Sequence, residues 1–355
     1  MRLRWWIVLI FGLLLVSVAI APPHGVAGAE PAQAQGEKNR FGLPRPLPRK
    51  EGAIRIAAYN VLNLFDHEDD PALSGEQDDM KLAASDDRCR GLAAAIRAVN
   101  ADIVALEEVE SLSCLRWFRD TYLADMRYAH LASFDVGYYR GIEQSVMSRL
   151  PITHAEVWPD LSLDDVKRIG PGFSAVPGKY RLGLTMQRSP LRVDVKVNDD
   201  YELTLFIVHH KSGGDYRFQR EAEALKTIEL IDEVRRRDSS RNIIVLGDFN
   251  AAPWDKSLRL YLQAGFIDTL AHRIIPRWRE DDQTEANLYK THESNRVLDY
   301  ILLSSAAHRE FVIGSAHVFG TLYDPDYDWR EDPFPPGYAS DHYPVIIDLI
   351  PRDIR

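Results

Sequence analysis

The chain has 355 residues, of which 45% are hydrophobic, 27% charged and 10% aromatic. This composition excludes an intrinsically disordered or fibrous protein and allows one large domain, or two ordinary ones, with a sizeable core. A formal net charge of −10 excludes nucleic-acid binding through the field of the whole protein. A nucleic-acid ligand would therefore need a local basic patch or bound cations.

The first 29 residues have the features of a secretory signal peptide. Arg2 and Arg4 precede an uncharged apolar stretch over residues 5–21, and Ala27-Gly28-Ala29 offers a cleavage site. Cleavage would export the protein to the periplasm or the medium, whereas an uncleaved apolar stretch would anchor it to the membrane. Because residues 1–29 hold two arginines and no acidic residue, their removal would change the formal charge from −10 to −12.

A change in composition separates this segment from the rest of the chain. Residues 30–51 are rich in Pro, Ala, Gln, Gly and basic side chains, which predicts a disordered tether. Residues 52–355 are expected to form one domain, in which strands and helices alternate as in layered α/β proteins. The expected strands are 54–59, 102–106, 144–147, 191–197, 203–208, 242–246, 297–303 and 343–350, and the expected helices are 86–100 and 218–237.

Cys89 and Cys114 are the two cysteines of the chain. In an oxidising compartment they could form a disulfide, and two buried free thiols are the alternative. Neither is expected to be catalytic, because no histidine motif accompanies either one.

Polar side chains stand at or near the end of one apolar strand after another. Ligand sites of open sheets gather at strand ends, so these side chains are expected to meet in one place. Carboxylate and carboxamide oxygens are ligands for a hard cation, and solvated acidic loops or Asp/Asn turns are the alternative. The residues concerned are Asn60, Glu108, His209, Asp248, Asn250, Asp299, Asp341 and His342.

Asp299 is expected within the apolar strand 297–303, where an unpaired carboxylate would be costly. A histidine or Arg296 could pair with it. His342, in Ser340-Asp341-His342, titrates near neutrality and therefore suits a catalytic base for phosphate-ester hydrolysis.

Taken in order, these segments resemble the endonuclease/exonuclease/phosphatase superfamily, also called DNase I-like, over roughly residues 54–350. The resemblance implies a four-layered α/β sandwich, in which two mixed β-sheets pack face to face and helices flank them. It also implies a metal-dependent hydrolase of phosphate esters. The segments that carry it are strand-Asn at 60, strand-Glu at 108, His-x-Lys-Ser at 209–212, Gly-Asp-Phe-Asn at 247–250, Asp-Tyr-Ile at 299–301 and Ser-Asp-His at 340–342.

The resemblance also implies a metal site. Glu108 looks like the principal ligand of Mg²⁺ or Mn²⁺, with Ca²⁺ as a further option, and Asn60 lies beside it. Asp341 belongs to the same side of the cleft. Many relatives have Gln where this chain has Glu107, so either glutamate could be the ligand.

The remaining roles follow from the same resemblance. Asp248 would orient the attacking water and Asn250 would hold a phosphate oxygen. His342 looks like the general base, polarised by Asp299. His209 resembles the histidine that donates to the phosphoryl group.

Three further residues are expected to contact substrate. Lys211 and Ser212 follow the histidine pair and could contact phosphate, and Arg140 resembles a family residue that approaches it. His210 stands where relatives more often have an apolar residue, so the roles of His209 and His210 could be exchanged.

The substrate class stays open between two alternatives. Lys211, Arg217 and Arg220, interleaved with Tyr216 and Phe218, favour a nuclease through backbone contact and base stacking. The net negative charge favours a phosphodiesterase or phosphatase acting on lipid headgroups or small phosphate esters. An inactive binding protein is disfavoured because every expected site residue is present, and the sequence does not indicate an obligate protein partner.

Overall fold

A computed structural model describes residues 41–69, 73, 82–178, 183–270, 287–322, 327 and 332–353. All of them belong to the second of two units, residues 1–33 and 34–355, into which the chain divides. The expected signal peptide therefore lies outside the described residues. Within the described ranges, no helix combines the length and hydropathy needed to cross a membrane.

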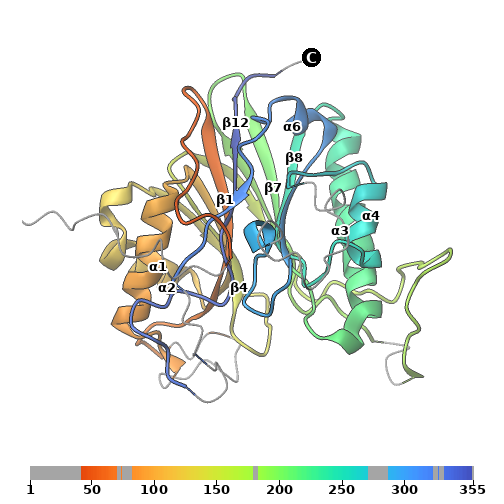
Figure 1. The fold of residues 1–355 in the computed structure, drawn as a ribbon. Helices are drawn as coiled ribbons and strands as arrows, with labels where there is room; N and C mark the ends of the chain where they lie inside the picture. Colours follow the sequence, from red (N-terminus) through yellow and green to blue (C-terminus); the bar gives the residue numbers. More distant parts are fainter. Residues whose placement is uncertain are drawn as a thin grey trace, which may run out of the picture. The chain divides into compact units, whose positions relative to one another are not determined.

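Two mixed sheets of six strands each form the centre of the fold (Figure 1). In the first sheet, with the order β11-β12-β1-β2-β4-β3, β1 and β2 are parallel and the other pairs are antiparallel. Its strands are β1 (Ile54–Leu64), β2 (Ile103–Val109), β3 (His130–Ser133), β4 (Glu143–Ser148), β11 (His317–Val318) and β12 (Val345–Leu349).

The second sheet repeats this plan, with the order β5-β6-β7-β8-β10-β9. Here β7 and β8 are the parallel pair, and the other pairs are antiparallel. Its strands are β5 (Ile152–Glu156), β6 (Leu191–Lys196), β7 (Glu202–His209), β8 (Asn242–Asp248), β9 (Ile267–Asp268) and β10 (Asp299–Leu303).

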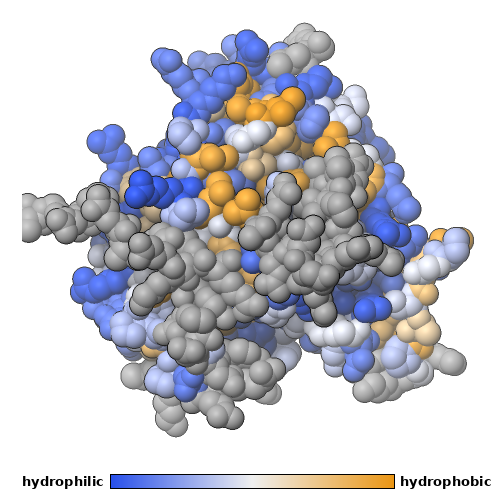
Figure 2. All heavy atoms as spheres, viewed as in Figure 1, coloured by the Kyte–Doolittle hydropathy of each residue, from blue (hydrophilic) through white to orange (hydrophobic). Residues whose placement is uncertain are grey.

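Helices cover the outer face of each sheet, which gives four layers. Leu92 of α1 and Phe118 of α2 pack with Val104 on the first sheet, and Ile231 of α3 and Tyr261 of α4 pack on the second sheet. In the view of Figure 1, hydrophilic residues line the outer edges of the described surface, and hydrophobic residues gather near its upper centre (Figure 2). The helices are α1 (Asp86–Val99), α2 (Leu112–Tyr122), α3 (Arg217–Arg237), α4 (Lys256–Gln263) and α6 (Ser305–Arg309), with 3-10 turns η3 (Ala124–Met126), η5 (Gly214–Tyr216) and η6 (Asn287–Tyr289).

The expected sandwich is thus confirmed, with differences at the element ends. Strand β2 extends to Val109 and so includes both glutamates, and β10 begins at Asp299, which places this carboxylate at a strand end rather than mid-strand. Residues 41–50 of the expected tether pack on the domain, with Phe41 buried against Tyr343. Cys89 and Cys114 are both buried free thiols.

The core between the sheets is apolar along most of its length and becomes polar at one end. Side chains alternate between the two faces of a strand, so Leu203, Leu205 and Ile207 of β7 point into this core, and His209 follows them on the same face. Several other strands show the same change from apolar side chains to a polar one along the face that points into the core. They run Ile56, Ala58, Asn60 in β1; Ile103, Ala105, Glu107 in β2; Ile244, Leu246, Asp248 in β8; and Leu303, Ile301, Asp299 in β10.

Candidate active site

The polar end of the core contains a buried histidine–carboxylate pair. His342 Nδ1 lies 2.8 Å and 3.0 Å from the two carboxylate oxygens of Asp299, and the Thr291 hydroxyl donates to Asp299 at 2.6 Å. Burial alone would lower the pKa of His342, but the charge and hydrogen bond of Asp299, together with the charges of Asp341 and Asp248, raise it well above its usual value. The pair fixes the ring, and its other nitrogen, Nε2, lies 3.9 Å from Asp248 Oδ2.

Asp248 lies at the centre of the cluster. Its Oδ2 accepts from the side chains of Asn60 at 3.3 Å and Asn250 at 2.9 Å, and its Oδ1 accepts from the Asn250 backbone N–H. His209 Nε2 lies 3.5 Å from the same Oδ2. Burial raises the pKa of Asp248 to about 7, in spite of the opposing charge of His342.

Glu108 reaches this cluster because the backbone turns at its position. Its φ of +67° departs from strand geometry, and the ladder between β2 and β4 shifts register between Leu106 and Val109. Its Oε2 accepts from the Asn63 N–H at 3.0 Å, and its Oε1 lies 3.6 Å from His209 Nε2. Arg140 lies 3.7 Å from Glu108 and donates to the Asn63 side chain at 2.6 Å.

Glu107 is completely buried beneath the cluster. Neither carboxylate oxygen has a hydrogen-bond partner among the described residues. Burial, together with the charges of Asp299 and Asp248, raises its pKa well above the usual value. Gly247 makes room for it, since a Cβ there would lie 2.6 Å from Glu107 Oε1 and 2.3 Å from the Val208 carbonyl oxygen.

The two neighbouring histidines face opposite sides of β7, as strand alternation requires. His209 points into the cluster, and burial, with the positive charges of Arg188 and Arg140, lowers its pKa well below the usual value. His210 points toward the helical layer, where its Nε2 lies 2.9 Å from the Tyr261 hydroxyl. This geometry favours the site role for His209 rather than for His210.

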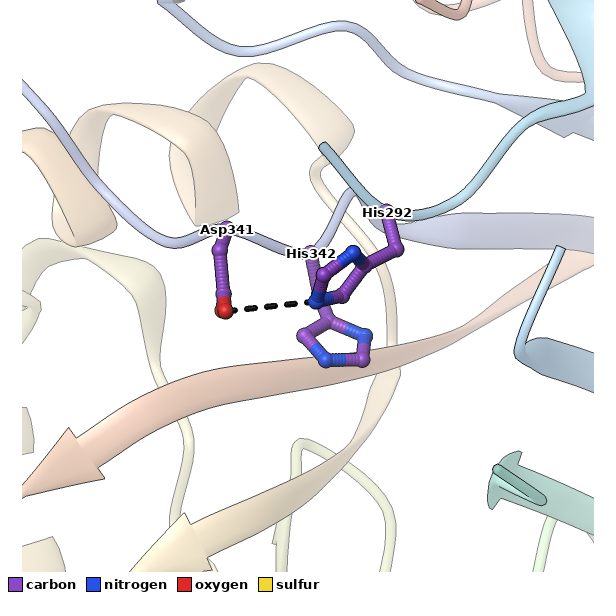
Figure 3. Close-up of side chains that lie close together, drawn as sticks. All are labelled: His292, Asp341 and His342. Atoms are coloured by element: carbon purple, nitrogen blue, oxygen red, sulfur yellow. Dashed lines mark ion pairs between the residues drawn. The ribbon is translucent and has the colours of Figure 1, made fainter. Parts of the chain in front are cut away.

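Asp341 has a partner that the sequence did not indicate. His292 Nε2 lies 3.3 Å from Asp341 Oδ2, and its ring meets the ring of His342 edge-on at 4.5 Å (Figure 3). Burial would raise the pKa of Asp341, but His292 and His342 lower it to about 2. His292 belongs to a short β-bridge with Arg296 and His342, a long-range pairing without a local sequence signal.

The expected phosphate contacts have different positions. Asn250 donates to Asp248 and to the His210 carbonyl oxygen at 3.0 Å, so it belongs to the cluster. Lys211 is partly exposed, with Nζ donating to Gln187 at 3.1 Å, and Ser212 is exposed. Phe218 and Arg220 are both buried, so Phe218 is not available for the base stacking that its spacing suggested.

The donor atoms of this cluster fit a hard divalent cation. Glu108, Asp248, Asp341 and Asn60 offer carboxylate and carboxamide oxygens, which Mg²⁺, Mn²⁺ and Ca²⁺ accept. The unpartnered carboxylate of Glu107 shows that the cluster holds more acidic oxygen than its own hydrogen-bond donors satisfy. Asp248, Asp299 and His342 also place one ligand atom each within 4.8 Å of one another, as do His292, Asp341 and His342.

Comparisons with known proteins agree with this fold. The structure resembles the catalytic domain of human Nocturnin with bound sulfate anion, with a TM-score of 0.54 and 16% identity over 85% of this chain and 95% of that one. It also resembles an endonuclease/exonuclease/phosphatase from Beutenbergia cavernae, with a TM-score of 0.53 and 20% identity over 85% of this chain and 72% of that one. A family protein from Bacteroides thetaiotaomicron is similar too, with a TM-score of 0.51 and 17% identity over 84% of this chain and 97% of that one. No curated protein sequence gives a significant match.

The sequence itself decides the family. The profile of the Endonuclease/Exonuclease/phosphatase family matches residues 57–342, which include every site residue described above. Members of this family are hydrolases of phosphate ester bonds that use divalent metals. The chain therefore belongs to the endonuclease/exonuclease/phosphatase family and is a metal-dependent phosphoesterase.

Proposed function

We propose that the protein is an exported nuclease that hydrolyses phosphodiester bonds in nucleic acid with the help of a divalent cation. The observation that carries the proposal is the buried Asp299–His342 pair, whose Nε2 faces Asp248 across 3.9 Å. A general base needs a fixed position beside the water that it deprotonates, and the bond to Asp299 fixes the ring in such a position.

Each residue of the cluster has a part in the proposed reaction. Asp248 orients the attacking water, and His342 takes its proton at Nε2 while Asp299 stabilises the charged ring. Asn250 holds the Asp248 carboxylate in place through its side-chain amide, and His209 donates a hydrogen bond to the phosphoryl group as its charge develops.

The cation site consists of Glu108, with Asn60 and Asp341 as further oxygen donors. The bound cation, Mg²⁺ or Mn²⁺ with Ca²⁺ as an option, supplies positive charge that stabilises the phosphoryl oxygens. Arg140, Lys211 and Ser212 are the proposed phosphate contacts. Arg140 is suited to this role because its guanidinium lies beside Glu108 and stays partly exposed.

The choice of nucleic acid over lipid or small phosphate esters rests on local charge. A cationic strip within one Debye length, about 8–10 Å, can outweigh a negative net charge. Lys211 and Arg217 are accessible beside the cluster, in the same segment as His209.

The test is hydrolysis of plasmid DNA, RNA, sphingomyelin and bis(p-nitrophenyl) phosphate, each with Mg²⁺, Mn²⁺, Ca²⁺ or EDTA. We expect nicking or degradation of DNA or RNA that EDTA abolishes. Turnover of sphingomyelin or of the small diester, with intact nucleic acid, would favour the lipid or small-ester alternative and refute the nuclease.

Export has a separate test. The apolar stretch at residues 5–21 and the cleavage site at 27–29 support it. Cell fractionation and N-terminal sequencing should find a mature protein outside the cytoplasm that begins near Glu30; an intact N-terminus on a cytoplasmic protein would contradict it.

A further inference from the structure

A polar pocket lies where α3 and α4 meet residues 171–174. Its volume is about 350 Å³, and it is lined by the N-terminal part of α3 and by α4 with the segment before it. Four basic side chains line it, namely Arg217, Arg220, Lys256 and Arg259. None of them belongs to the cluster of carboxylates and histidines described above.

The acidic side chains of the pocket already have partners. Glu221 accepts from Arg168 at 2.7 Å and from the Ser174 hydroxyl at 2.7 Å. Asp255 accepts from the Ala252 N–H at 2.9 Å. With four basic and two acidic side chains in its lining, the pocket has an excess of positive charge in a protein whose formal net charge is −10.

Arg220 gives this pocket a guanidinium group that is fixed in position and has one hydrogen-bond donor without a partner among the described residues. The residue is only 2% exposed, and its Nη1 donates to the carbonyl oxygens of Lys211 at 2.9 Å and Gly213 at 2.7 Å. Its Nε has no hydrogen-bond partner among the described residues. A buried cationic donor left unpaired is costly, and an anionic oxygen in the pocket would satisfy it.

Trp254 adds a flat apolar surface to the same pocket. Its side chain is 51% exposed, so the ring is accessible to a ligand in the pocket. An exposed aromatic ring beside basic side chains is the combination that binds single-stranded nucleic acid, because bases stack on the ring while cations neutralise the backbone.

Two segments of the chain connect the pocket to the catalytic cluster. Arg220 fixes the carbonyl groups that follow His209, and Trp254 comes four residues after Asn250. Four residues span at most about 14 Å, so the two places lie within about four nucleotides of each other at about 3.4 Å per nucleotide.

We infer that this pocket binds a phosphate group and an adjacent base of a nucleic-acid strand, a few nucleotides from the bond that is cleaved. This inference rests on the proposed nuclease function and names the substrate as a strand longer than a dinucleotide. Lys256 and Arg259 neutralise the backbone, Trp254 stacks on a base, and Arg220 supplies the buried donor.

The experiment compares a 12-nucleotide single strand with bis(p-nitrophenyl) phosphate, using Trp254→Ala and the double variant Lys256→Gln/Arg259→Gln. The matched control is Arg236→Gln/Arg237→Gln, which removes the same charge from exposed positions in the last turn of α3. We expect kcat/KM for the oligonucleotide to fall about tenfold in each pocket variant, mainly through KM. Turnover of the small diester should be unchanged in all variants.

Salt dependence gives a second readout. If Lys256 and Arg259 neutralise the phosphate in the pocket, their removal should reduce the slope of log(kcat/KM) against log[salt] by about 0.7, the contribution of one single-strand phosphate. Equal oligonucleotide turnover in wild type and pocket variants, or an equal loss in the control, would overturn the inference and leave the nuclease function intact. A wild type that hydrolyses the small diester but not the oligonucleotide would refute the nuclease function itself.

Membrane docking through Trp254 is the competing use of the pocket. It would appear as binding of the wild type to phosphatidylserine vesicles that Trp254→Ala abolishes, with oligonucleotide turnover unchanged. That result would also overturn the inference.

Discussion

His342 and Asp248 face each other as a proton acceptor and a carboxylate that can hold water. Asp299 occupies one imidazole nitrogen of His342 at 2.8 Å, so proton transfer is restricted to the other. Asp299 begins β10 directly opposite Asp248 of β8 in the ladder, so adjacent strands hold the two carboxylates, and Asp299 in turn holds the ring. This rigidity is what a site for general-base chemistry requires.

Replacing His342 should reduce catalysis strongly without removing cation binding. We expect His342→Ala to lower kcat about 10²–10⁴-fold, the usual contribution of general-base catalysis, while Mn²⁺ still raises the melting temperature. His154→Ala, at an exposed position on β5, is the control and should retain full turnover. Turnover of His342→Ala at the wild-type rate would remove His342 from the mechanism.

Strand β8 lies close to the Val208 carbonyl oxygen of β7 and to the Glu107 side chain of β2 because residue 247 is a glycine. The φ of Gly247 is +124°, a region that L-residues rarely adopt, and the Glu107 carboxylate lies where a Cβ would be. This close packing places Asp248 opposite His209 in the parallel pairing of β8 with β7. The geometry of the cluster thus depends on a glycine that has no chemistry of its own.

Gly247→Ala should therefore destabilise the fold by about 2–5 kcal/mol, through backbone strain and steric overlap together. The control is Gly265→Ala, which shares a positive φ, +88°, but meets no atom within 4 Å. Its cost should be limited to about 1–2 kcal/mol. Urea unfolding of both variants measures the difference, and equal midpoints would show that the contacts of Gly247 do not matter.

Strand β4 carries a buried carboxyl group that supports the loop of Arg140. Glu143 accepts from the Val136 N–H at 3.2 Å, and burial raises its pKa to about 9. Since the folded state holds this proton more tightly than the unfolded state, the contribution of Glu143 to stability is greatest below about pH 4.5 and is lost as the pH rises toward 9.

Glu143→Gln removes the titrating group and keeps an acceptor oxygen. We expect the variant to melt at a higher temperature than wild type at pH 8 and at a similar temperature at pH 4. The exposed Glu51→Gln should show no such pH-dependent difference. A Glu143→Gln protein that is less stable at pH 8 would mean that the carboxyl group is ionised in the fold.

At the scale of the whole molecule, the site is the polar end of a core shared by two sheets. The polar residues at the strand ends and the order of the motifs predicted that these side chains would meet. Other features had no local signal: His292 enters through a long-range bridge to His342, and the positive φ of Glu108 could not be read from its position after an apolar strand. The basic pocket was equally hidden, because Arg220 and Trp254 are 34 positions apart in the sequence.

The proposal that this polar end is a cation-dependent catalytic centre is tested most directly by a Mn²⁺ titration of phosphodiester hydrolysis by wild type and Glu108→Gln. Glu156→Gln, at a half-buried position on β5, serves as the control. We predict that Glu108→Gln needs at least about tenfold more Mn²⁺ for half-maximal turnover, or loses turnover, because its principal carboxylate ligand is gone. An unchanged Mn²⁺ dependence in Glu108→Gln, or hydrolysis that continues in EDTA, would contradict it.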